Sequence, residues 1–270
     1  MSKKRKIISL IIFISVAVLL IIAIVLTKPP QGKESINEAM KEQVLHESDK
    51  FNLFGLKVNA GVISAFTVTA IITVFAVIIR IFVIPKFSYN PSKFQIFLEE
   101  SVSLFSKTAE KDSKDKSSFI GAYVFTAGVY VFFGTLFELF GFQAISSSGK
   151  SVTLPAPLSD INGAISLGCL SYLIILFGGI RYNGIKGVGK TLKEFSLPLS
   201  MSFRLFGALL SGALVTELVY YYTALSFVLP VIVGLMFTVL HAIIQAYVLT
   251  MLTSLFYGEV TEKKLKEKRK

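Results

Sequence analysis

Residues Ser196–Val215 read SLPLSMSFRLFGALLSGALV, an apolar stretch in which Arg204 is the only charged residue. The stretch lies in a longer apolar run, Phe195–Leu225, and about 20 mostly apolar residues suffice for a helix to cross a bilayer. An arginine at the centre of a membrane helix costs about 2.5–3.5 kcal/mol on insertion scales, and such residues mark functional sites. The stretch therefore predicts a membrane protein organised around Arg204.

The rest of the chain has the same apolar character. Hydrophobic residues make up 53% of the 270 residues and charged residues 17%, whereas about a quarter of a soluble domain is charged. Five further runs are long enough to span a bilayer: Ile7–Leu26, Val58–Ile84, Phe119–Phe142, Ile161–Ile180 and Phe227–Tyr257. No stretch has the alternation of barrel strands, so we expect an all-α polytopic membrane protein with about six hydrophobic helices.

Polar segments between these runs define the organisation of the chain. We interpret residues 1–27 as an extra N-terminal membrane anchor, because the apolar run is long for a signal peptide and no A-x-A-like cleavage site follows it. Within the membrane domain, residues 86–118 contain the pattern FQIFLEESVSLF and are expected to lie on the membrane surface, while residues 195–257 form a helical hairpin. The external connector, the membrane domain and a basic tail occupy residues 28–57, 58–260 and 261–270.

Basic residues fall mainly on one side of the predicted membrane. If the N-terminus is cytoplasmic, six crossings place 21 of the 28 Lys and Arg residues on the cytoplasmic side and six outside, with Arg204 left over. This distribution follows the positive-inside rule and predicts that both termini are cytoplasmic. It also accounts for the net charge of +11 without nucleic-acid binding.

Other polar groups lie in the apolar runs or at their edges: Glu138, Asp160, Glu217, His241 and Gln245. His241 and Gln245 are four residues apart and share one face of the last helix, where either an interhelical hydrogen bond or a place on an ion pathway accounts for them. Glu217 lies 13 residues after Arg204, roughly 20 Å along a straight helix and too far for an ion pair.

Small residues follow Arg204 at intervals of three to four positions and form a smooth helix face. Such a face usually permits close helix packing, and it also allows another helix to pass near Arg204. Both interpretations stay open for Gly207, Ala208, Ser211, Gly212 and Ala213.

Several chemistries are excluded by composition and context. Cys169 is the only cysteine and the chain has two histidines, so we expect no disulfide, no metal centre and no CxxC redox motif. Gly184–Thr191, GIKGVGKT, fits the Walker A pattern, but a phosphate loop needs a preceding strand inside an αβ domain. Here a membrane helix precedes it, so we interpret Arg181–Lys193 as a basic cytoplasmic loop and expect no cofactor.

Three segments carry a resemblance to a known family. SLPLSMSFRLFG, with Pro198, Ser200 and Arg204–Gly207, resembles a segment of the a subunit of the rotary F-type ATP synthase, the stator of the membrane sector. QAYVLTMLTSLF, beginning at Gln245, is similar to the last helix of the family. PAPLSDINGAISL, which contains Asp160 and Asn162, resembles the segment that opens the fourth helix of the family. The resemblance covers about residues 45–260, and residues 1–27 are an extra segment relative to many members.

The resemblance implies a mechanism. The last two long helices would lie tilted, nearly in the membrane plane, against a rotating ring of c subunits. Arg204 would favour the ionised form of each passing ring carboxylate, because an opposite charge lowers the pKa of a carboxyl group. Arginine keeps its charge, so it would act as a gate between two half-channels and carry no proton itself. The candidate half-channel residues are Gln245, Glu217, His241, Glu138, Asp160 and Asn162, and the rotor-facing small residues are Gly207, Ala208, Ser211 and Gly212.

The resemblance also implies partners and a location. The expected partners are the c-subunit ring, the b-subunit peripheral stalk, the catalytic F1 sector, the lipid bilayer and translocated H⁺ or Na⁺, in a bacterial plasma membrane. By itself such a subunit is no enzyme. The alternative is an independent proton- or sodium-coupled transporter in which Arg204 binds an anionic substrate, although the chain has no internal repeat of the kind common in transporters.

The chain departs from the family pattern at a few positions. Ala208 stands where the family commonly has Asn, and Ala213 where an acidic residue or His is often found; Glu217, one turn further, is the candidate replacement. His241 lies one turn before Gln245 and not at the more usual polar position near Thr238. These departures leave the lining of the outer half-channel open.

Overall fold

The structure, a computed structural model, describes most of the predicted membrane domain. Five helices in this part of the chain are long and apolar enough to cross a membrane: Ala60–Lys86, Ser118–Phe140, Ile161–Lys193, Ser196–Thr216 and Leu229–Thr261. The described residues are 14–15, 18–19, 22, 50–53, 56–112, 117–145, 151–221 and 229–262. Most of the predicted anchor at Ile7–Leu26, of the connector and of the tail lies outside them. The polytopic all-α prediction is confirmed for the described residues.

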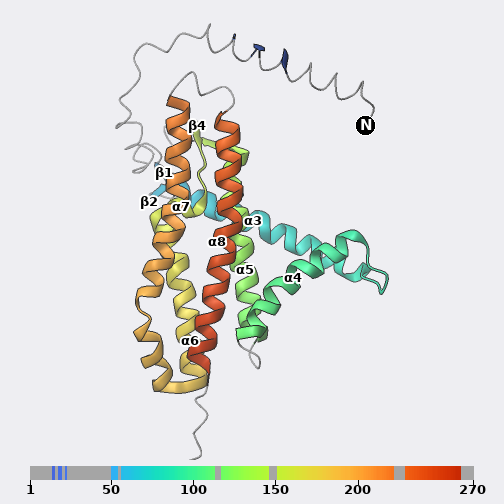
Figure 1. Ribbon diagram of the computed structural model, residues 1–270, viewed down its shortest axis with the longest axis vertical. Helices are drawn as coiled ribbons and strands as arrows, with labels where there is room; N and C mark the ends of the chain where they lie inside the picture. The colour runs from blue at the N-terminus through green and yellow to red at the C-terminus, as the bar shows by residue number, and fades with distance from the viewer. Residues whose placement is uncertain are drawn as a thin grey trace, which may run out of the picture. The chain divides into compact units, whose positions relative to one another are not determined.

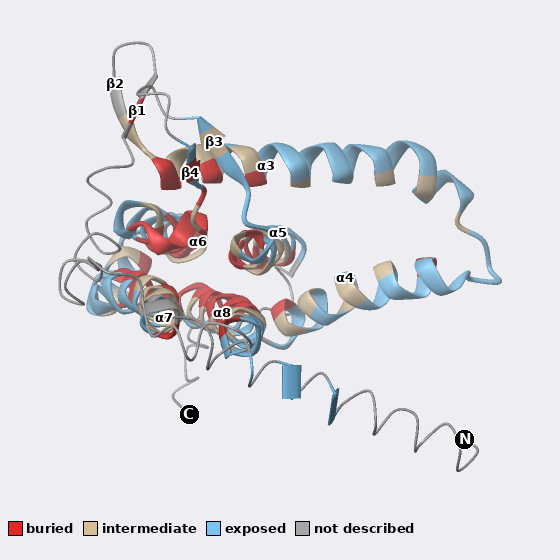
Figure 2. Cartoon of the chain, turned by 90° about the horizontal axis from the view of Figure 1, so that it is seen from above, coloured by how far each residue is buried: buried red, intermediate tan, exposed pale blue. Residues whose placement is uncertain are grey.

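The first two helices of the membrane domain extend to the same side of the remaining helices (Figures 1 and 2). Helix α3, Ala60–Ile78, continues through the π-helical turn η1, Ile79–Val83, into the 3-10 turn η2, Ile84–Lys86. Pro85 lies in η2, and the helix ends here because proline lacks an N–H donor. Helix α4, Lys93–Asp112, returns toward the other helices, so the predicted surface segment is helical.

Two short hairpins occupy connectors that were not predicted to contain strands. Strands β1, Lys50–Leu53, and β2, Leu56–Asn59, pair antiparallel with Phe51 opposite Val58. Strands β3, Gln143–Ile145, and β4, Ser151–Thr153, pair antiparallel with Ala144 opposite Val152. Phe51 and Val152 are buried in one cluster with Phe137, which lies just after helix α5. Helix α5 spans Ser117–Leu136, and the 3-10 turn η3, Phe137–Phe140, follows it directly.

Helix α6 is longer than predicted. It spans Ile161–Lys193, and its helical backbone geometry is interrupted only at Gly184, with φ 56° and ψ −137°. Glycine tolerates a positive φ because it has no Cβ, and the chain resumes helical geometry after it. The prediction of a loop at Arg181–Lys193 is therefore wrong: this basic segment is helical and turns at Gly184.

The last two helices are α7, Ser196–Tyr221, and α8, Leu229–Thr261. Residues 49–210 and 238–270 form one compact unit, and residues 1–48 and 211–237 form another. In the first unit, side chains from α5, α6, α7 and α8 share one buried cluster, shown red in Figure 2, whose members include Val131, Ala164, Met201, Leu205 and Leu249. This core fixes which face of α7 points outward.

Candidate functional site

Arg204 lies on the exposed face of α7. Met201, Leu205 and Leu209 are buried in the core, at 2%, 2% and 5% exposure, so the opposite side of the helix points away from it. Arg204 is exposed on that side, next to Phe203. Among the residues that the structure describes, none forms a hydrogen bond or an ion pair with the side chain of Arg204. The guanidinium group is thus presented on the exposed face of an apolar helix that is long enough to cross a membrane.

The small residues after Arg204 fall into two environments. Gly207 and Ser211 are exposed on α7, whereas Ala208 and Gly212 are half-buried. A Cβ added at Gly207 would meet no atom of the described residues within 4 Å, while one at Gly212 would lie 3.8 Å from the Cβ of Phe237 on α8. Gly207 therefore leaves open space beside the arginine, and Gly212 serves helix packing.

Gln245 of α8 is turned toward the protein interior, whereas His241 is partly exposed. Gln245 is 5% exposed, beside the buried residues Ala246 and Leu249 of the core cluster. His241, one turn earlier, is half-buried. Gln245 forms no hydrogen bond with Arg204: Gln245 lies on a buried face of α8, and Arg204 lies on an exposed face of α7.

Asp160 is the centre of a hydrogen-bond network at the start of α6. It is 8% exposed, and its Oδ2 accepts a hydrogen bond of 2.8 Å from the Nδ2 of Asn59. Its Oδ1 accepts from the backbone N–H of Asn162 at 2.9 Å and from the Asn162 Nδ2 at 3.1 Å. Asp160 is therefore the N-cap of α6, a role that aspartate fills well because its carboxylate satisfies free N–H groups of the first turn.

The remaining acidic candidates lie apart from this network. Glu138 is half-buried in the turn η3, where its backbone carbonyl accepts a 3.2 Å hydrogen bond from the N–H of Gly141. Glu217 belongs to α7, and its side chain lies outside the described residues. In the described part of the chain, no group of three or more His, Cys, Asp or Glu residues is arranged to hold a metal ion.

Arg204, Gln245, Asp160 and the other acidic candidates lie within one family match. The sequence model of the ATP synthase A chain family matches residues 62–258. The chain belongs to this family. It is thus an integral membrane protein of the Fo sector of an ATP synthase, the sector that couples ion transport to ATP synthesis. Membership also implies a c-ring partner for this ATP synthase A chain.

Two hydrogen-bonded pairs of this ATP synthase A chain were not predicted from the sequence. Asn59, just outside the family match, holds Asp160 from a position 101 residues away. Its location directly before an apolar run is a typical N-terminal helix signal, but that signal does not name its partner. Inside the membrane domain, Tyr123 on α5 and Ser171 on α6 form a hydroxyl pair at 2.8 Å.

Proposed function

We propose that this ATP synthase A chain is the ion-translocating stator subunit, with Arg204 as the charge gate between two half-channels. A single observation carries the proposal: Arg204 is exposed on α7 and has no partner in the described part of its own chain. A desolvated, unpaired charge is strongly unfavourable in a membrane. A carboxylate on a passing c subunit would supply the missing opposite charge.

Open space next to the guanidinium group supports a moving partner. Gly207 follows Arg204 by three residues, so both lie on one face of α7, and no atom in the described part of the chain lies within 4 Å of a Cβ placed at Gly207. A c-subunit helix sliding past this face would meet no bulky side chain at Gly207. The arginine holds its charge throughout, so it would compel each ring carboxylate to ionise before that carboxylate passes.

The half-channel residues carry unequal support. Gln245 is buried on α8 and His241, one turn earlier, is half-buried, and both are proposed to line a polar path within the protein. Both oxygens of Asp160 are already engaged by Asn59 and Asn162, so we propose that Asp160 shapes the outer half-channel by ordering the start of α6. Glu138 and Glu217 remain proposed half-channel residues.

The proposal extends to topology and partners. With both termini cytoplasmic in a bacterial plasma membrane, the b-subunit stalk and the F1 sector complete the stator and the catalytic part of the complex. The amphipathic helix α4 would lie at the cytoplasmic surface, with Phe94 and Phe97, at 47% and 65% exposure, toward the acyl chains. The transported ion is H⁺ or Na⁺, and the carboxylate site of the ring would determine which of the two is transported.

Disulfide trapping between this chain and the ring tests the proposal. The native thiol is first removed by Cys169→Ser, because Cys169 is exposed. Gly207→Cys is then paired with a single cysteine next to the ring carboxylate, and we expect a disulfide in the assembled complex. Leu173→Cys, at an exposed position of α6, is the control and should not react. Absence of a disulfide at Gly207 would reject the ring-facing assignment, and with it the gate.

A further inference from the structure

The C-terminal part of α6 folds back on its own helix. After the turn at Gly184, the backbone of Gly187 packs directly against that of Gly179, where an added Cβ at either position would overlap the facing atoms. The hydroxyl of Tyr172 donates to the Thr191 carbonyl at 3.1 Å, and the Thr191 hydroxyl donates to the Gly187 carbonyl at 3.0 Å. The returning segment is thus fixed to the body of α6.

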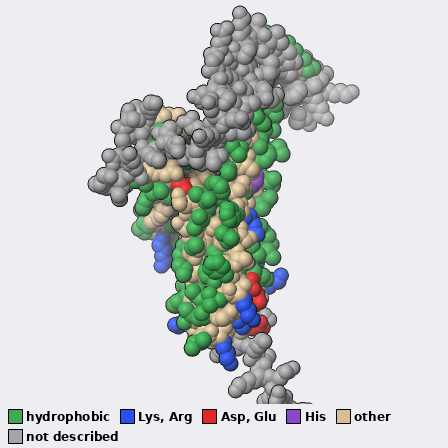
Figure 3. Space-filling view, turned by 90° about the vertical axis from the view of Figure 1, so that its left-hand side faces the viewer, with side chains coloured by type: hydrophobic (Ala, Val, Ile, Leu, Met, Phe, Trp, Pro, Cys, Tyr) green, Lys and Arg blue, Asp and Glu red, His purple; other side chains and the backbone are tan. Residues whose placement is uncertain are grey.

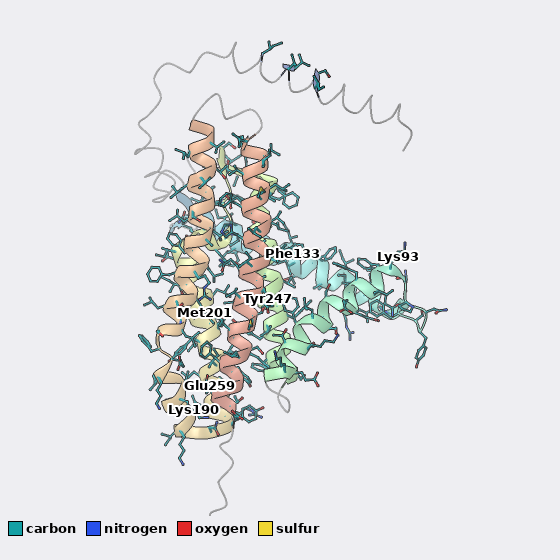
Figure 4. All side chains as sticks on the ribbon, viewed as in Figure 1. Lys93, Phe133, Lys190, Met201, Tyr247 and Glu259 are labelled. Carbon is teal, nitrogen blue, oxygen red and sulfur yellow. The ribbon has the colours of Figure 1, made fainter. Side chains whose placement is uncertain are left out.

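Asn183, just before the turn, and Lys190, in the returning segment, both reach the end of α8. The Nδ2 of Asn183 donates to the carbonyls of Val260 at 2.6 Å and Glu262 at 3.2 Å. The Nζ of Lys190 donates to the carbonyls of Glu259 at 3.2 Å and Glu262 at 2.9 Å. Figure 4 shows Lys190 and Glu259 at the same end of the helices, and Figure 3 shows that basic side chains gather there.

These donors meet a chemical need of the helix end. The last carbonyls of a helix lack N–H partners within the helix, and the C-terminal end of the helix dipole favours a cation. Lys190 supplies both a donor and a positive charge, and Asn183 supplies a second donor. The lysine of the Walker-like pattern is thus engaged within the chain as a helix-capping group.

The same helix end is packed closely on α6. Tyr257 lies against Gly178, and the Cγ1 of Val260 lies 2.6 Å from where a Cβ of Gly179 would stand. Tyr257 and Val260 are each 2% exposed. Gln245 lies 15 residues before Val260, about four helical turns earlier on the same continuous helix, and is buried as well. Because α8 is one continuous helix, rotation of its C-terminal end about the helix axis would also rotate Gln245. Such a rotation would turn the Gln245 side chain away from the core.

We propose that Asn183 and Lys190 form a latch that fixes the rotation and axial position of α8 and thereby positions Gln245. Lys190 is in this sense a positioning residue for ion transport. The consequence for transport rests on the proposed stator function, whereas the latch itself does not. The torque of a rotating ring would act on α7 and α8, and the latch would hold the end of α8 against it.

Hydrogen exchange on the assembled complex tests the latch directly. In Asn183→Ala/Lys190→Ala, we expect the backbone amides of residues 258–262 to exchange about 5–30-fold faster, the effect of losing one to two kcal/mol of local stability. Lys190→Ala alone should fall between this variant and the wild type, and Lys190→Arg should restore protection. Lys186→Ala is the matched control, because Lys186 is exposed in the same segment and has no hydrogen bond to any described residue. Unchanged exchange in both alanine variants would overturn the latch.

Transport measurements test the positioning role separately. In inverted vesicles, the double variant should pump fewer ions per ATP hydrolysed than the Lys186→Ala control. Faster exchange with a wild-type pumping ratio would reject the positioning of Gln245 by the latch. If an Arg204→Ala complex pumps ions normally, the stator proposal fails. The hydrogen-exchange result would still decide whether the latch exists.

Discussion

Replacing Asp160 by alanine would remove three hydrogen bonds at the start of α6 in one step. They join the carboxylate to the Asn59 Nδ2 at 2.8 Å, the Asn162 N–H at 2.9 Å and the Asn162 Nδ2 at 3.1 Å. Loss of an N-cap costs about 0.5–2 kcal/mol, and a partly buried amide left without its acceptor costs about 1–3 kcal/mol. Because Asn59 is only partly buried, we expect the free energy of unfolding to fall by about 2–3 kcal/mol.

The contribution of the long-range bond can be isolated with a double-mutant cycle. Asn59→Ala, Asp160→Ala and the double variant are unfolded with dodecyl sulfate in mixed micelles, and the free energies are compared. We expect a coupling energy of about 1 kcal/mol between Asn59 and Asp160. Asn162→Ala is the control, since it keeps the backbone hydrogen bond to Asp160. Effects that add within about 0.5 kcal/mol would refute the bond between Asn59 and Asp160 as a source of stability.

Three further substitutions test the packing around the site. Gly187→Ala forces a methyl group into the facing backbone of Gly179 and should lower the free energy of unfolding by about 1–3 kcal/mol. Gly189→Ala should not lower it in the same assay, because no atom of the described residues lies within 4 Å of the added Cβ. Tyr123→Phe removes the 2.8 Å hydrogen bond with Ser171 and should lower the free energy of unfolding by about 0.6 kcal/mol. The same loss in a Ser171→Ala background, where this hydrogen bond is already absent, would contradict the assignment. Gly207→Leu should leave insertion and assembly intact but reduce ATP-driven pumping, because the larger side chain would fill the space proposed for a passing c subunit; wild-type pumping would count against that proposal.

Hydropathy predicted the membrane helices well but their buried faces poorly. The spans predicted at Val58–Ile84 and Phe119–Phe142 differ by about two residues from the observed helices Ala60–Lys86 and Ser118–Phe140. Yet Ala208 and Gly212 were grouped with Gly207, although they are half-buried and Gly207 is exposed. In a membrane, side chains that face lipid and side chains that face the core are both apolar, so periodicity does not separate them.

Other features depend on contacts that no local pattern records. The basic composition of Arg181–Lys193 suggested a loop, but its helix is held by packing on the body of α6 and by bonds to the end of α8. Asn59 and Asp160 are 101 positions apart, and only the folded chain brings them together. The short hairpins likewise have no long alternating pattern, because each strand has only three or four residues.

Arg204 could be recognised from sequence because its cost in lipid is large and local, and the structure adds that it is exposed on α7. The most direct test of its role is ATP-driven ion pumping by inverted vesicles that contain the complex with Arg204→Ala. We predict that pumping is abolished while the complex still assembles with its c ring, and that Phe203→Ala, on the same exposed side of α7, still pumps. Normal pumping by the Arg204→Ala complex would contradict the gate.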